Sequence, residues 1–136
     1  MESAGYTLSL LPHAYAIVRL APTDAWAAWA REAEGLVVVA RTDEELSIVC
    51  REAALPADVA RAGAWRALRV HGPFPFDTVG VLASLSGALA RAQVSVLAVS
   101  TYDTDYLLVR AEQLEAAVAA LSQRNRVLGE EGGGHG

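Results

Sequence analysis

The sequence has no lysine and only one cysteine. The distribution of its basic residues bears on possible binding partners, and the single cysteine bears on disulfides and on the cellular compartment. All eleven basic residues are arginines, and they stand apart along the chain instead of forming a cluster. Binding along a phosphate backbone needs a basic stripe, so we do not expect nucleic acid as a partner. A chain rich in alanine and arginine but without lysine is typical of a GC-rich bacterial genome.

The single cysteine, Cys50, excludes an internal disulfide and fits a reducing cytoplasm. No signal peptide is recognisable in the first residues, and the longest apolar runs fall far short of the ~20 residues of a membrane helix. The histidines, His13, His71 and His135, share no metal-ligand spacing. We therefore expect a cytoplasmic protein without membrane contact, metal or cofactor.

Composition indicates a folded chain: of 136 residues, 53% are hydrophobic and 20% are charged, with a net charge of -5. This length suits one ordinary domain, or two very small ones that share a core. Apolar periodicity predicts eight strands and three helices. The strands are expected at 6–11, 14–20, 36–40, 46–50, 65–71, 94–100, 106–109 and 126–128. The helices are expected at 24–32, 78–93 and 112–123, with Thr23 and Asp77 as caps of the first two.

An internal repeat organises these elements. The stretch 36–49 can be laid on 96–109, sixty residues later, because both read as an apolar run, an acidic turn and a second apolar run. Each half is then β-α-β-β, and the second half adds a helix. We expect an α+β fold with helices on one face of antiparallel sheets. The predicted units are 1–62 and 63–128, followed by a disordered Gly-rich tail at 129–136.

The segment 73–80 is the first candidate binding element. A helix opening leaves unpaired backbone N–H groups and a partial positive charge, which suit a ligand carboxylate. Gly80 would let a ligand approach the backbone closely. The other interpretation is an ordinary capped helix, with Asp77 accepting from its own first turn. The candidates here are Asp77, Thr78, Val79 and Gly80.

The acidic turn 100–105 is the second candidate element. A carboxylate of Asp103 or Asp105 could hold a ligand ammonium or guanidinium group, and Ser100 and Thr101 could add hydroxyl contacts. Aspartate in a tight turn also commonly bonds backbone N–H groups, so a purely structural role stays open. The first-half counterpart, 43–45, reads as a solvated turn or as half of a second pocket.

Both candidate segments belong to a stretch of sequence that resembles a known protein family. The pattern Asp77-x-x-Gly80-x-Leu82 after a strand and loop resembles the ligand-binding corner of ACT domains. The stretches 45–50, 65–72 and 94–109 are similar to small bacterial tandem ACT-domain proteins, which are related to the CASTOR-type arginine sensors. The resemblance covers residues 6–128. It implies two tandem ferredoxin-like ACT units, βαββ plus βαββα, and in the arginine sensors an acidic residue matching Asp105 contacts the ligand.

By this resemblance we expect a regulatory protein that binds an amino acid, with arginine or another basic amino acid as a candidate, and that is not an enzyme. Edge-to-edge pairing of units implies a homodimer, and the regulated partner is not identified. A structural dimerisation domain with a vestigial pocket is the first alternative. A small enzyme is the second, although it would have to use Asp103, Asp105 or isolated histidines.

Overall fold

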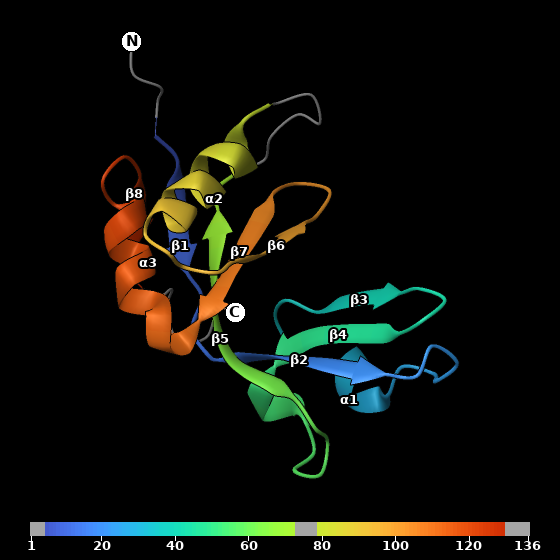
Figure 1. The fold of residues 1–136 in the computed structure, drawn as a ribbon. Helices are drawn as coiled ribbons and strands as arrows, with labels where there is room; N and C mark the ends of the chain where they lie inside the picture. The colour runs from blue at the N-terminus through green and yellow to red at the C-terminus, as the bar shows by residue number, and fades with distance from the viewer. Residues whose placement is uncertain (1–4, 73–78, 130–136) are drawn as a thin grey trace.

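The computed structural model describes residues 5–72 and 79–129. Within these ranges eight strands form one connected sheet, flanked by three α-helices and two 3₁₀ turns (Figure 1). The strands are β1 (Thr7–Leu10), β2 (Tyr15–Leu20), β3 (Val38–Arg41), β4 (Leu46–Arg51), β5 (Ala62–Val70), β6 (Leu97–Ser100), β7 (Asp105–Arg110) and β8 (Arg126–Leu128). The helical elements are α1 (Ala28–Arg31), η1 (Glu52–Ala54), α2 (Val81–Arg91), η2 (Ala111–Gln113) and α3 (Leu114–Leu121). The α+β, ferredoxin-like class expected from the sequence is confirmed.

Strand β5 is shared by two half-sheets. Its first residues pair with β2, and its last three pair with β1 on the same side. The other side of β5 pairs with β7, which in turn pairs with β6. The first half-sheet is therefore β3-β4-β2-β5, and the second is β6-β7-β5-β1-β8.

The predicted units therefore share a strand at their junction. The boundary at 62/63 falls at the start of β5, which both half-sheets use. Strand β1 lies within the predicted first unit, yet it pairs with β5 and β8 of the second half-sheet. The division into 1–62 and 63–128 remains a prediction, and the tail from 130 onward lies outside the described residues.

The two hairpins do repeat, but their offset is 59 residues instead of sixty. Val38 faces Val49 across β3 and β4, as Leu97 faces Leu108 across β6 and β7. An offset of sixty would place Val38 on Ala98, whose side chain points to the opposite face. The expected alignment was wrong by one residue, because apolar runs such as 36–40 hide the period of two that fixes strand register.

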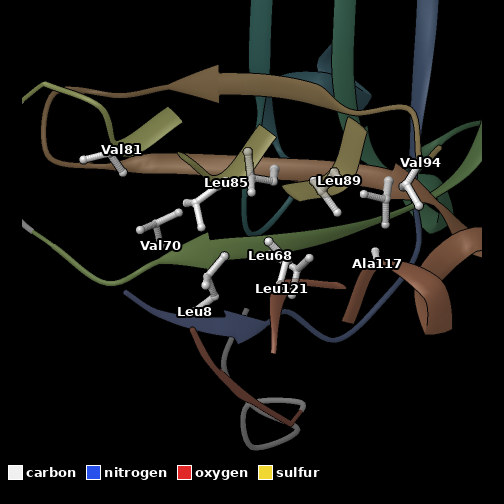
Figure 2. Close-up of a cluster of buried hydrophobic side chains, with 11 residues drawn as sticks. Leu8, Leu68, Val70, Val81, Leu85, Leu89, Val94, Ala117 and Leu121 are labelled. Atoms are coloured by element: carbon white, nitrogen blue, oxygen red, sulfur yellow. The ribbon is translucent and has the colours of Figure 1, made fainter. Parts of the chain in front are cut away.

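Three apolar clusters give the molecule its layers. In the second half, α2 and α3 cover one face of the sheet (Figure 2). In the first half, α1 and η1 cover the face formed by Ala16, Val18, Ile48 and Cys50. The third cluster joins the helix-free faces of both halves. The buried members of the second-half cluster are Leu8, Leu68, Val70, Val81, Leu85, Leu89, Val94, Leu107, Val109, Ala117 and Leu121.

The helices are shorter than predicted. Only Ala28–Arg31 of the range 24–32 is helical, and Asp24 instead accepts the backbone N–H of Ala21 at 3.2 Å in a turn. The second helix begins at Val81, not at residue 78. The range 112–123 divides into a 3₁₀ turn and α3. The start of α2 is set by Gly80, whose φ of +90° is left-handed and cannot continue a right-handed helix. No helix in the described ranges is long and apolar enough to cross a membrane.

Gly35 contributes to the stability of the first half, and a substitution can test this. Its φ of +77° is left-handed, and a Cβ there would lie 3.0 Å from Arg51 Nε and 3.1 Å from the Tyr15 hydroxyl. We expect Gly35→Ala to lower the free energy of unfolding by about 2–3 kcal/mol, since strain and crowding add. Gly80→Ala is the matched control, because its φ is +90° but nothing lies within 4 Å. Urea denaturation giving equal losses for both variants would show that crowding at residue 35 contributes nothing.

Cys50 is fully buried. Burial raises the pKa of its thiol, and the positive charge of Arg61 opposes this only in part. The folded protein therefore keeps a proton that the unfolded chain loses at alkaline pH. The associated stability is present below the ordinary thiol pKa and is lost as pH rises through the folded-state pKa. We expect Cys50→Ala to lose less stability than the wild type as the pH becomes alkaline. We also expect Ellman's reagent to label Cys50 near neutral pH only as fast as the chain unfolds. Rapid labelling of the native protein would contradict this.

Candidate functional site

One end of the second half-sheet brings three elements together. Because β5 and β7 are antiparallel and Arg69 pairs with Tyr106, the end of β5 lies beside the β6–β7 turn. Helix α2 starts at this same end (Figure 1). Two of the predicted binding residues, Asp77 and Thr78, lie outside the described residues. The other six are in the structure, and all of them lie at this end of the sheet.

The opening of α2 is formed by Val79 and Gly80. Gly80 is the N-cap residue, and its carbonyl accepts the N–H of Ser84 at 2.9 Å. Its φ of +90° requires a residue without a side chain, and a Cβ there would meet nothing within 4 Å. No side chain of the described residues caps this helix. The Val79 side chain is 86% exposed. The first helical turn is thus accessible from outside.

The β6–β7 turn is held rigidly against β5. The backbone N–H of Thr101 donates to the Thr104 carbonyl at 2.8 Å, and the Thr101 hydroxyl accepts the Thr104 N–H at 3.2 Å. The Thr104 hydroxyl donates to the carbonyl of Val70. A Cβ on Gly72 would lie 3.0 Å from the Asp103 carbonyl oxygen, so the chain leaving β5 passes close to the turn. These bonds fix the backbone position of the turn that carries Asp103 and Asp105.

Ser100 and Asp105 share the face of the sheet that α2 covers. They are a cross-strand pair, and the Ser100 hydroxyl donates to Asp105 Oδ1 at 2.6 Å. Leu107 and Val109, two and four residues further along β7, lie in the cluster under α2. Because side chains alternate along a strand, Asp105 points to that same face. The helix opening and this carboxylate are therefore at one end and on one face.

Asp103 and Thr101 instead line a hollow of about 350 Å³. Its other lining residues include Arg69 and Tyr106, whose side chains alternate with those of the helix-side cluster and so point to the helix-free face. The sequence left Asp103 and Asp105 unseparated, and the fold places them on different sides of the hairpin. The hollow carries both charge signs, from Arg69 and Asp103.

Sequence reasoning missed Arg69, Tyr106, Gly72 and Thr104 as neighbours of the turn. The alternation of 65–71 could have placed Arg69 opposite the buried Leu68 and Val70. No sequence signal pairs Arg69 with Tyr106, since that requires the register between β5 and β7.

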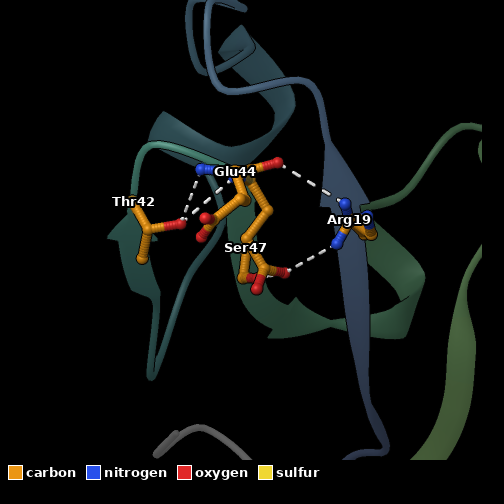
Figure 3. A network of polar contacts seen from close by, with 5 residues as sticks. Arg19, Thr42, Glu44 and Ser47 are labelled. Atoms are coloured by element: carbon orange, nitrogen blue, oxygen red, sulfur yellow. Dashed lines mark hydrogen bonds and ion pairs between the residues drawn. The ribbon is translucent and has the colours of Figure 1, made fainter.

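The first-half turn has the same backbone design as the β6–β7 turn. Thr42 and Glu45 repeat the Thr101–Thr104 bond, with the Thr42 N–H donating to the Glu45 carbonyl at 2.8 Å. The Glu45 carboxylate accepts from Arg19 at 3.2 Å and from Ser47 at 3.0 Å. Figure 3 shows Arg19, Thr42, Glu44 and Ser47 of this network. Asp43 and Glu44 are exposed. Its only half-buried carboxylate, that of Glu45, is therefore already engaged. No group of three or more potential metal ligands occurs in residues 5–72 and 79–129.

Two family profiles match this chain. The ACT-domain family profile matches residues 62–123. A second profile, which describes an N-terminal domain, matches residues 13–58.

Several solved structures resemble most of the chain. Protein Atu0741 from Agobacterium tumefaciens is 36% identical, with a TM-score of 0.88 over 98% of both chains. The regulatory subunit of aspartate kinase from Thermus flavus superposes with a TM-score of 0.60 over 90% of this chain and 99% of that one. Its identity is 14%, so this second likeness is one of fold alone.

Among characterised proteins, subunit 1 of the cytosolic arginine sensor for mTORC1 from Bos taurus is 35% identical over 66 residues. The human protein of the same name is 34% identical over 65 residues. The match covers 48% of this chain but 20% of the bovine sensor, so the chain matches about a fifth of that relative's length. On its matched profile and its fold, this chain belongs to the ACT-domain proteins and is a distant relative of the cytosolic arginine sensors.

Proposed function

We propose that the protein is an amino-acid sensor that binds its ligand where α2 opens beside the Ser100–Asp105 pair. ACT domains are typically regulatory modules that bind small molecules such as amino acids. The observation that carries the proposal is the placement of an accessible helix opening and a half-buried carboxylate at one end of one face. These two groups have opposite electrostatic character, as a zwitterionic ligand requires.

The helix opening suits the ligand's carboxylate. Backbone N–H groups of the first turn point out of the helix, and the helix dipole adds a partial positive charge. Gly80 adds no side chain, so an oxygen atom can approach the backbone.

The Ser100–Asp105 pair suits a positively charged group of the ligand. Ser100 occupies Oδ1 of Asp105 and fixes the carboxylate, and no hydrogen bond among the described residues uses Oδ2. A guanidinium or ammonium group could bind there with a charge-assisted hydrogen bond. The distant relation to arginine sensors supports a basic amino acid as the ligand.

The direct test is thermal unfolding of the full chain with each of the twenty amino acids. A ligand at a hundred times its dissociation constant stabilises the folded state by ~2.7 kcal/mol, which is readily measured in a small domain. We expect the largest shift with arginine or another basic amino acid, and none with the corresponding amine that lacks the carboxylate.

The other outcomes separate the alternatives. A well-folded sample that no amino acid stabilises would favour a structural dimerisation domain. Consumption of the bound amino acid, detected by mass spectrometry and lost in Asp105→Asn, would instead identify an enzyme.

We further infer that the protein pairs through an open sheet edge and passes its signal to a partner protein. Among the described strands, β6 pairs only with β7 and β3 pairs only with β4, so each presents a free edge. The described part of β6, Leu97–Ser100, has no charged side chain to discourage pairing. Sedimentation equilibrium is expected to give a dimer, and a monomer at all concentrations would contradict the pairing.

A further inference from the structure

A second hollow, of about 380 Å³, lies on the helix layer between α2 and the end of α3. Small side chains such as Ser84, Ala88 and Ala120 line it, which explains why the helices leave a space. Arg91 of α2 and Arg124 after α3 also line it, together with Gln123. This hollow shares no residue with the proposed amino-acid site.

Its charge is unusual for this protein. The chain carries a net charge of -5, yet the hollow contains two arginines and no acidic residue. Within residues 5–72 and 79–129, the guanidinium groups of Arg91 and Arg124 have neither an ion pair nor a hydrogen bond. By contrast, the exposed Arg19 in the first half pairs with Glu45 at 3.2 Å.

Arg124 sits on a segment that is held in place. The Asn125 side chain accepts the backbone N–H of Tyr6 and donates to the carbonyl of Leu121, each at 2.9 Å. Gly5 passes so close to the Arg124 carbonyl that any side chain at residue 5 would collide with it. The backbone that presents Arg124 therefore loses little freedom when a ligand binds. The bond from Asn125 also satisfies the Leu121 carbonyl at the negative end of α3.

Arg91 reaches back along its own helix. A Cβ at Gly87 would lie 3.4 Å from Arg91 Nη1, so the guanidinium group lies over the preceding turn of α2. This is the turn that contains Ala88, another lining residue of the hollow. The absence of a side chain at residue 87 gives the guanidinium group room there.

We propose that this hollow binds a phosphate group through Arg91 and Arg124. A guanidinium group presents a planar fork of donors that matches phosphate oxygens, and two such groups neutralise a doubly charged oxyanion. The Gln123 amide and the Ser84 hydroxyl line the same space and supply further donors. The source is either free phosphate or the phosphate ester of a small metabolite.

The test uses ¹H–¹⁵N NMR of the full chain, titrated with inorganic phosphate at constant ionic strength. We expect saturable shifts of amides in 84–92 and 120–125. The double variant Arg91→Gln/Arg124→Gln should weaken binding at least about tenfold. Arg126→Gln is the matched control, because it removes a nearby exposed arginine that does not line the hollow.

Three further titrations complete the experiment. Chloride alone should leave these amides unshifted, and acetate should bind more weakly than phosphate. Glycerol phosphate that binds more tightly than phosphate supports the proposal and points to a phosphorylated metabolite, whereas equal or weaker binding supports it with free phosphate. Shifts that do not saturate, that chloride reproduces, or that persist in the double variant would overturn it. None of these results depends on amino-acid binding.

Discussion

Replacing Leu68 by alanine is expected to lower the free energy of unfolding by about 3 kcal/mol, within the range of about 2–5 kcal/mol typical of buried leucines. Leu68 has no exposed surface and lies in the cluster beneath α2 and α3. Its strand is paired on both sides at this position, with Leu10 of β1 and Leu107 of β7. The surrounding backbone therefore cannot collapse to fill the cavity.

Urea denaturation checks this value, with Leu82→Ala as the control. Leu82 packs on the edge of the same cluster but is only partly buried, so its truncation should cost clearly less. A loss below about 1 kcal/mol for Leu68→Ala would show that α2 and α3 do not pack on β5 as described.

The same denaturation curves test whether the two halves fold together. Trp26 and Trp29 pack in the first-half cluster, whereas α2 and α3 give the second half most of its helical signal. Because β5 belongs to both half-sheets, tryptophan fluorescence and circular dichroism should report one coincident transition in the wild type and in Leu68→Ala. Two separated transitions would show that the halves are independent domains.

The second large effect is expected at Asp105. Asp105→Asn should weaken binding of a basic amino acid by about 10–100-fold, which corresponds to the loss of a charged hydrogen bond of about 1.5–3 kcal/mol. The variant keeps the size of the side chain and an oxygen that can still accept from Ser100. Binding of a neutral amino acid should change little, because only the ligand's positive side chain loses its partner.

Isothermal titration with arginine and with a neutral amino acid measures this difference. Asp103→Asn is the matched control, since it removes the same charge from the same turn but on the side of the hollow with Arg69. If Asp103→Asn weakened arginine binding more than Asp105→Asn did, the ligand would lie in that hollow and the proposed site would be on the wrong face. Equal, small effects would mean that long-range charge, not contact, explains them.

Much of the fold could be predicted because each element has its own local signal. Eight apolar runs gave eight strands, and 126–128 was placed to the residue. Helix lengths were overestimated because apolar spacing continues past the residues whose backbone conformation ends the helix, as at Gly80 with its left-handed φ. Strand register could not be predicted in runs that are apolar on both faces, which is why the repeat was displaced by one residue.

The candidate site shows the same limit. The sequence identified both the helix opening and the acidic turn, since glycine, proline and aspartate mark such positions by their own conformational preferences. It could not decide between Asp103 and Asp105, because that choice depends on which side of the β6–β7 hairpin each side chain leaves. No local sequence pattern distinguished Arg69, Arg91 or Arg124 from the other arginines. Their role in the two hollows depends on neighbours that other elements supply.

By itself, the sequence determined the α+β class, the approximate positions of the strands and helices, the repeated hairpin and the location of the two candidate binding elements. These depend on interactions among residues a few positions apart, which composition and spacing record. Only the tertiary structure decided that β5 serves two half-sheets, that β1 joins the second one, and that Asp105 shares a face with the opening of α2. Those features depend on strand pairing and side-chain packing between segments that are distant in the sequence. A local pattern of residues does not record the free energy of such interactions.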